Sequence, residues 1–106
     1  MNTVQLTPPT TSAPAKTLTL SIVIPIHNEA RTIQALIRRV QQVPLEGIAR
    51  EIIVVDDAST DGTAATLQQL DGTIRVLRHP TNLGKGAAVR SGFEAATGDI
   101  LLIQDA

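Results

Sequence analysis

The sequence lacks several residue types, and each absence excludes a class of site. It has no cysteine, so disulfide bonds and thiolate metal sites are excluded and the redox compartment stays open. Phe93 is the single residue among Phe, Tyr and Trp, which argues against an aromatic platform for stacking nucleic acid bases. Neither sign of charge dominates, because nine basic and ten acidic residues give a formal net charge of -1. We therefore expect no strong field that recruits nucleic acid or an anionic membrane.

Long apolar runs are also missing. No stretch approaches the roughly 18 apolar residues that a membrane-spanning helix needs. The first 17 residues are rich in Thr, Pro and Ala, and they lack the basic start and apolar core of a secretory signal. Because Pro8, Pro9 and Pro14 interrupt any strand and little surface can be buried, this segment is predicted to be a disordered tail. These features predict a cytoplasmic protein with one domain, residues 18–106.

From residue 18 onward, strand patterns and helix patterns alternate. Runs of consecutive apolar and β-branched residues predict strands at 18–26, 51–55, 74–77 and 100–103. Helices are predicted around the apolar stripe from Ile33 to Val40, at 63–70, and at 87–96, where small residues would face the sheet. The alternation predicts an α/β fold with a mostly parallel, Rossmann-like sheet and helices on both faces.

Polar residues follow three of the predicted strands. Residues 25–29 (PIHNE) end the first strand, Asp56 and Asp57 follow the second, and Asp105 and Ala106 follow the last. In open parallel sheets, ligands bind at the carboxyl ends of the strands. The sequence therefore predicts that these groups converge on one binding edge.

Asp56 and Asp57 follow a buried strand directly, and two interpretations of them stay open. A carboxylate here can cap the next turn or helix by accepting backbone N–H groups. It can also accept the ring N–H of a uracil or guanine and so select a nucleotide. Residues 57–62 (DASTDG) imitate the start of an EF-hand loop, but Gln68 stands where a bidentate Glu is required. We interpret this segment as an Asx-type turn into a helix and expect no calcium site.

Residues 84–86 (GKG) invite comparison with phosphate-binding loops. A Walker loop is excluded, because His79 stands where its first glycine is needed and Gly86 stands where Ser or Thr is needed. The fingerprint of an NAD(P)-type dinucleotide-binding module stays open as an alternative, although Val89 occupies its third glycine position. The simplest interpretation is a helix-start loop in which glycine permits unusual backbone angles and Lys85 is solvated.

Asp105 is the candidate metal ligand. With the upstream segments, Asp105 and Ala106 look like the opening of an Asp-x-Asp motif, whose carboxylates hold a hard divalent cation beside a diphosphate. His27 and His79 have no partners at metal-ligand spacing, so neither is assigned a metal role.

Four segments, in order, resemble the N-terminal, nucleotide-binding part of the family 2 glycosyltransferases: SIVIPIHNEA, EIIVVDDASTDGT, NLGKGAAVRSGFEAATGD and LLIQDA. The similarity runs from about Leu18 to Ala106 and is greatest to the polyprenol- or dolichol-phosphate mannosyltransferases and their glucosyltransferase relatives. The resemblance implies half of a GT-A fold and a site at the residues that match the family's motifs. Pro25, His27 and Glu29 would line the nucleotide, Val55 and Asp57 would contact base or ribose, and Asp105, with Ala106 beside it, would contact the nucleotide-sugar and Mg2+ or Mn2+.

The same resemblance implies hexosyl transfer from a UDP- or GDP-linked sugar to an acceptor such as a polyprenyl phosphate or a glycan. The family's acceptor site, catalytic base and any membrane-attaching segment lie after the Asp-x-Asp motif. We therefore expect a truncated, donor-binding half that transfers no sugar by itself and whose last strand leaves the sheet edge uncovered. The full-length form would act at the cytoplasmic face of the membrane. His27 stands where the mannosyltransferases commonly carry an aromatic residue, so the identity of the nucleotide base stays open. A nucleotide-binding module without chemistry is the remaining alternative.

Overall fold

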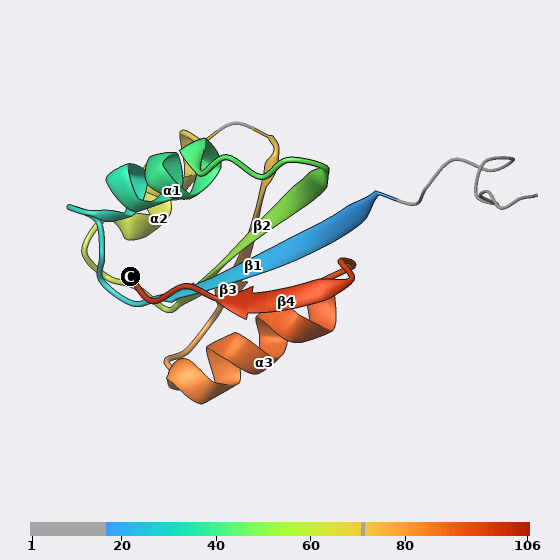
Figure 1. The fold of residues 1–106 in the computed structure, drawn as a ribbon. Helices are drawn as coiled ribbons and strands as arrows, with labels where there is room; N and C mark the ends of the chain where they lie inside the picture. The colour runs from blue at the N-terminus through green and yellow to red at the C-terminus, as the bar shows by residue number, and fades with distance from the viewer. Residues whose placement is uncertain (1–16, 71) are drawn as a thin grey trace, which may run out of the picture.

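The computed structural model describes residues 17–70 and 72–106, which form a four-stranded sheet with helices on both sides (Figure 1). The elements in chain order are β1 (Leu18–Ile26), α1 (Ile33–Gln42), β2 (Ile48–Asp57), α2 (Thr63–Gln68), β3 (Ile74–His79), α3 (Lys85–Ala95) and β4 (Ile100–Ile103). The strands are ordered β3-β2-β1-β4, and every neighbouring pair is parallel. The predicted α/β class is therefore confirmed. The predicted disordered tail, residues 1–17, lies outside the described residues except for Thr17.

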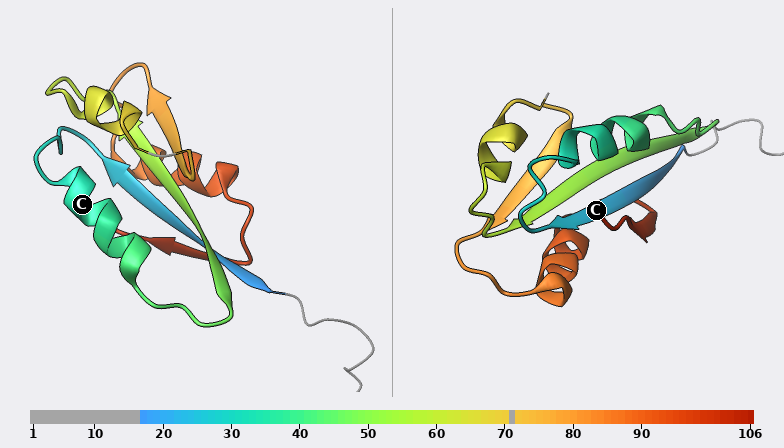
Figure 2. Two further views of the ribbon diagram at one scale, coloured as in Figure 1. Left: turned by 90° about the horizontal axis from the view of Figure 1, so that it is seen from above. Right: turned by 90° about the vertical axis from the view of Figure 1, so that its left-hand side faces the viewer.

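The two faces of the sheet carry different cores. Helices α1 and α2 cover one face and α3 covers the other (Figure 2). Successive residues of β1 and β2 point to opposite faces, so each strand supplies both cores. The larger core, toward α1 and α2, includes Ile22, Ile24, Ile26, Ile33, Ile37, Val40, Ile52 and Val54. The smaller core, toward α3, is formed by Val23, Ile53, Val55 and Ala88.

Helix α3 approaches the sheet closely because its inner face is made of small residues. Ala88 is 1% exposed. A Cβ atom built at Gly92 would lie 2.3 Å from Cγ1 of Val23, so any larger residue would push the helix away. The prediction that small residues face the sheet is confirmed. This packing fixes the start of α3 beside the carboxyl ends of the strands.

Element boundaries differ from the predicted ones for identifiable reasons. β2 runs from Ile48 to Asp57, whereas its apolar run predicted residues 51–55. The parallel ladder with β1 carries the strand past its apolar residues, because backbone pairing does not depend on side-chain polarity. Helix α3 begins at Lys85 rather than at residue 87, because Gly84, with φ 96°, serves as its N-cap.

β4 is an edge strand whose apolar side chains are partly open to solvent. Ile100, Leu101, Leu102 and Ile103 are 42–47% exposed. This uncovered edge was expected from the sequence. Within residues 17–70 and 72–106, no helix combines the length and apolar character needed to cross a bilayer.

Candidate functional site

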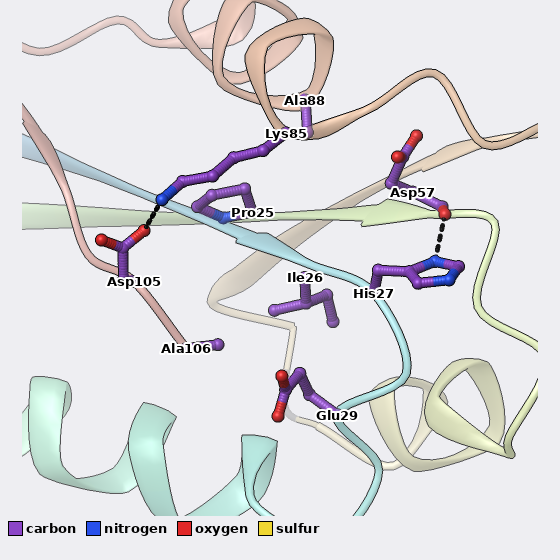
Figure 3. A pocket seen from close by; sticks show the side chains of 9 residues that line it. All are labelled: Pro25, Ile26, His27, Glu29, Asp57, Lys85, Ala88, Asp105 and Ala106. Carbon is purple, nitrogen blue, oxygen red and sulfur yellow. Dashed lines mark hydrogen bonds and ion pairs between the residues drawn. The ribbon is translucent and has the colours of Figure 1, made fainter.

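The carboxyl ends of β1 and β2, the segment after β4 and the start of α3 surround a cavity of about 270 Å³ (Figure 3). It is lined by Pro25, Ile26, His27, Glu29, Asp57, Lys85, Ala88, Asp105 and Ala106. The structure thus brings together every predicted site residue except Val55. Val55 is fully buried in the core beneath α3. The binding roles of all these residues stay predictions.

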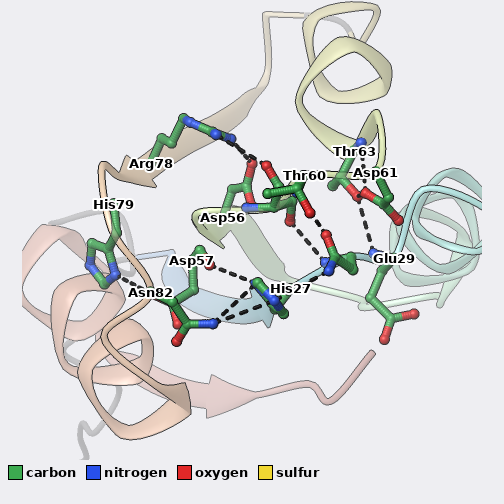
Figure 4. Close-up of polar contacts among 12 residues, drawn as sticks. His27, Glu29, Asp56, Asp57, Thr60, Asp61, Thr63, Arg78, His79 and Asn82 are labelled. Atoms are coloured by element: carbon green, nitrogen blue, oxygen red, sulfur yellow. Dashed lines mark hydrogen bonds and ion pairs between the residues drawn. The ribbon is translucent and has the colours of Figure 1, made fainter.

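Two loops at this edge are joined by side chains that bond to the opposite backbone (Figure 4). The amide of Asn28 donates to Oγ of Ser59 at 2.9 Å, and the amide of Thr60 donates to Oδ1 of Asn28 at 2.8 Å. The amide of Glu29 donates to Oγ1 of Thr63 at 3.1 Å. Asn28 has φ 57°, a left-handed conformation that Asn tolerates better than most residues. These bonds fix the backbone at Glu29, the residue that ends the PIHNE segment.

The ring of His27, which follows β1, is held at the cavity by the end of the neighbouring strand β2. Its Nδ1 lies 2.7 Å from the backbone carbonyl oxygen of Asp57 (Figure 3). Because a carbonyl only accepts, Nδ1 must carry the proton in this contact. In the neutral ring, Nε2 is then an acceptor, and the side-chain amides of Asn28 and Asn82 lie 3.3 and 3.4 Å from it. The cavity therefore has an oriented, planar, polar ring on one wall.

The carboxylate of Asp57 binds the loop before α3. It accepts the amides of Leu83 at 2.9 Å and Gly84 at 2.8 Å, and Nδ1 of His79 at 2.8 Å. Nε2 of His79 lies 2.8 Å from Oγ of Ser91 on α3. Burial raises the pKa of Asp57, but the hydrogen bonds from Leu83, His79 and Gly84 outweigh this and leave the pKa below its ordinary value. Asp57 therefore stays ionised, and its hydrogen bonds to Leu83 and Gly84 hold the start of α3 in place.

The neighbouring acidic residues have structural roles. Asp56, on the opposite face of β2, accepts the amide of Ser59 at 3.0 Å and pairs with Arg78 (Figure 4). Asp61 accepts the amide of Thr63 at 3.0 Å, and its side-chain bond from Thr63 helps to hold the pKa of Asp61 below its usual range. The turn-capping interpretation of Asp56 and the Asx-type turn at Asp61 are both confirmed.

Lys85 is the site residue whose contact the sequence did not predict. Its ammonium pairs with Oδ1 of Asp105 across the end of β1 (Figure 3). From the sequence, Lys85 was expected to be solvated or to belong to a phosphate-binding loop. The pair depends on the sheet order, which sets the segment after β4 beside the start of α3. The GKG motif at residues 84–86 drew attention to Lys85, but the spacing of residues along the chain does not show that its partner is Asp105.

The dinucleotide-binding alternative has little support from this geometry. In that fingerprint, backbone amides at the start of a helix receive the pyrophosphate of the cofactor. Here the amides of Leu83 and Gly84 already bind the carboxylate of Asp57. An internal anion therefore occupies part of the position that a cofactor's pyrophosphate would need.

The surroundings of Asp105 fit a metal ion that draws most of its ligands from a bound molecule. Its carboxylate is 68% exposed and already attracts the cation of Lys85. Among the described residues, no group of three or more His, Cys, Asp or Glu side chains could hold a metal ion. Mg2+ typically takes one or two carboxylates, substrate phosphates and several waters. A single open carboxylate suits a hard cation that binds together with a diphosphate.

Comparisons with known proteins agree with the resemblance drawn from the motifs. The pattern of Glycosyl transferase family 2 matches residues 21–106. The chain is 36% identical to the dolichol-phosphate mannosyltransferase of Pyrococcus furiosus, over 82% of this chain and 25% of that protein. It is 40% identical to the undecaprenyl-phosphate 4-deoxy-4-formamido-L-arabinose transferase of Pseudomonas aeruginosa, over 82% and 27%. The chain spans about a quarter of the length of these relatives.

Solved structures support the same relationship. A mannosyltransferase from Pyrobaculum calidifontis in complex with GDP-Man and Mn2+ matches with a TM-score of 0.70 and 28% identity, over 81% of this chain and 26% of that one. The glucosyl-3-phosphoglycerate synthase of Mycobacterium tuberculosis in complex with Mn2+, UDP and glucosyl-3-phosphoglycerate matches with a TM-score of 0.66 and 31% identity, over 83% and 33%. The predicted GT-A type of fold is confirmed.

Proposed function

The chain belongs to glycosyl transferase family 2, and we propose that its cavity binds the nucleoside diphosphate of a nucleotide-sugar donor. The observation that carries this proposal is the convergence of three strand-end segments on one cavity (Figure 3). His27 and Asp57 lie at one end of this cavity, and Lys85 and Asp105 lie at the other. We assign the first end to the nucleoside and the second to the diphosphate, because only the second offers an exposed ammonium and an open carboxylate. Residues 18–106 would form this domain.

The nucleoside end has the groups needed to hold a base and a ribose. Two of them are the ring of His27, which is bonded to the backbone carbonyl oxygen of Asp57, and the carboxylate of Glu29, whose backbone amide is bonded to Thr63. Ligand cavities usually measure about 300–1,000 Å³, so a cavity of about 270 Å³ accommodates a nucleoside better than a whole donor. Val55 would act from beneath the cavity by packing against Ala88, which lines it.

At the diphosphate end, Asp105 would hold Mg2+ or Mn2+, with Ala106 beside it. When bound, such an ion supplies positive charge that stabilises a leaving diphosphate. Two structural relatives contain Mn2+ together with GDP-Man or UDP, which agrees with this assignment. Lys85 and Asp105 orient that end of the donor, while His27 and Asp57 orient the other. Fixing the donor at both ends restricts its freedom, which is a recognised source of rate enhancement.

The acceptor is proposed from the relatives. The two curated relatives are named for transfer to dolichol phosphate and undecaprenyl phosphate. We assign this protein to the same class of reaction, in which a sugar passes from a nucleotide to a polyprenyl phosphate. The reaction would take place at the cytoplasmic face of a membrane, where a soluble nucleotide-sugar can meet a lipid phosphate.

Nucleotide binding by the protein tests this proposal. Isothermal titration calorimetry with UDP and GDP in the presence of Mn2+ should show saturable binding of at least one of them. Asp105→Asn should weaken that binding by on the order of tenfold or more, the scale of a lost charge-assisted contact. Glu94→Gln is the matched control, because Glu94 is an exposed carboxylate of α3 that does not line the cavity. Binding of neither nucleotide, or equal binding by the Asp105 variant, would contradict the proposal.

A further inference from the structure

Lys85 is the only lysine or arginine among the described residues that line the cavity. The other charged lining residues are the carboxylates Glu29, Asp57 and Asp105. Asp57 has its own donors in two backbone amides and His79. The ammonium of Lys85 instead lies on Asp105, the carboxylate that is expected to hold the metal. The free protein therefore already has a cation at the place where a metal ion would bind.

The start of α3 is held so that this lysine faces the cavity. Lys85 is the first residue of α3 and follows Gly84, whose amide is bound by Asp57. Ala88, one turn later on the same face of the helix, is buried and also lines the cavity. The backbone at Lys85 is thus fixed, while its side chain is 64% exposed and free to change partner.

We propose that Lys85 is an internal counter-ion that couples metal binding to donor binding; this inference rests on the proposed function. In the free protein the ammonium neutralises Asp105 and opposes metal binding, because both cations compete for the same carboxylate oxygen. When a nucleoside diphosphate enters, its phosphate oxygens give Lys85 a new partner. Asp105 is then released to the metal. Metal and nucleotide therefore each strengthen the binding of the other, as thermodynamic linkage requires.

The exposure of the pair sets the size of the effect. Both side chains are about two-thirds exposed, so solvent screens their attraction. Removing the ammonium should tighten Mn2+ binding to the nucleotide-free protein by about two- to fivefold, the scale of an exposed ion pair. The same change should weaken UDP or GDP binding in the presence of Mn2+ by about fivefold or more, because the diphosphate loses a charged partner. The opposite signs of these two effects separate a counter-ion from a residue that only stabilises the fold.

The experiment compares wild-type protein with Lys85→Met and Lys85→Arg. Electron paramagnetic resonance of free Mn2+ measures metal affinity without nucleotide, and calorimetry measures UDP and GDP affinity with Mn2+ present. Lys85→Met is expected to raise the first affinity and lower the second, whereas Lys85→Arg keeps the charge and should restore both to near wild-type values. In an Asp105→Asn background, Lys85→Met should have no effect on Mn2+ affinity, because the two residues act on each other.

Specific outcomes would overturn the inference. They are unchanged Mn2+ affinity in Lys85→Met, a change of both affinities in the same direction, or no detectable Mn2+ binding by either protein without nucleotide. A change of Mn2+ affinity that survives in the Asp105→Asn background would also overturn it. If wild-type protein bound neither nucleotide, the proposed function would fail instead. The Mn2+ affinities measured without nucleotide would still test whether Lys85 competes with the metal for Asp105. Circular dichroism melting of each variant checks that the fold is retained.

Discussion

Glu51 and Asp57 lie on the same face of β2, and each fastens one end of α3 to the sheet. Asp57 accepts the amides of Leu83 and Gly84, just before the helix. Glu51 accepts the amide of Thr97 at 2.9 Å and its hydroxyl at 3.1 Å, just after the helix. The same chemical device, a carboxylate that accepts loop amides, is therefore used at both ends of one helix.

The two ends differ in what lies next to the carboxylate. Asp57 lines the cavity, whereas Glu51 is not among its lining residues. Around Glu51, Ser21 donates from β1 at 2.7 Å and Arg75 approaches from β3 at 3.4 Å, so the network is built into the body of the sheet. Anchoring a helix therefore does not require a place at the cavity. Of the two networks, only the one at the carboxyl end has a carboxylate that both anchors α3 and lines the proposed donor site.

The largest expected effect is that of Asp57→Ala. This substitution removes the acceptor of the Leu83 amide and of His79, and it leaves the Gly84 amide only its bond to Oδ1 of Asn82. We expect a loss of about 3 kcal/mol in the free energy of unfolding, because each unsatisfied buried donor typically costs about 1–3 kcal/mol. Nucleotide affinity should fall at least about tenfold, since the lost carboxylate holds the backbone at Gly84, directly before Lys85. Urea unfolding and calorimetry measure the two effects, and unchanged affinity would remove Asp57 from the site.

Glu51→Ala should separate the two roles. The free energy of unfolding should fall by about 1–2 kcal/mol, because the amide of Thr97 and the hydroxyl of Ser21 lose their acceptor. Nucleotide affinity, measured on the fraction that is folded, should stay within about twofold of the wild-type value. A fall in affinity as large as that of Asp57→Ala would mean that the far end of α3 controls the site as strongly as the near end.

Acidification is expected to weaken the hydrogen bonds of both carboxylates, Glu51 and Asp57, more gradually than the two substitutions do. Burial raises the pKa of Glu51, but hydrogen bonds from Ser21, Thr97 and Arg75 leave it below its ordinary value of 4.5. The pKa of Asp57 is likewise below its ordinary value of 3.8. A carboxylate with a depressed folded-state pKa contributes stability above its unfolded pKa and loses it as the pH falls through the folded pKa. Stability should thus be level near neutral pH and should decline below pH 4.5 and further below 3.8.

Urea unfolding between pH 7 and pH 3 measures this decline. Glu51→Gln should flatten the upper part of the profile, because the substituted amide does not titrate. If wild-type and Glu51→Gln proteins lost stability in parallel over this range, the Glu51 network would not be the source of the pH dependence.

Much of this architecture could be predicted from the sequence, because the signals are local. The apolar runs predict β1 to β4, and the small inner residues predict the packing of α3 that Ala88 and Gly92 show. The convergence of His27, Asp57 and Asp105 also follows from their positions at strand ends, given a parallel sheet.

What could not be predicted depends on contacts between distant segments. The sequence gives no reason why the amides before α3 should bind Asp57, because α2 and β3 separate the residues involved along the chain. The partner of Lys85 likewise depends on the strand order β3-β2-β1-β4, which the periodicity of a single chain does not specify. The ends of β2 were missed because ladder pairing extends strands beyond their apolar residues.

The most direct test of the proposed site is a nuclear magnetic resonance titration of 15N-labelled protein with UDP and GDP in the presence of Mg2+. A nucleotide in the cavity should shift the amide signals of His27, Glu29, Lys85 and Asp105, while the signal of Thr97 beside Glu51 should stay in place. Replacing Mg2+ with Mn2+ should broaden the signals nearest Asp105 first, because the paramagnetic ion would lie beside that carboxylate. Shifts confined to the Glu51 end of α3, or no shift at saturating nucleotide, would contradict the assignment of the carboxyl-end cavity to the donor.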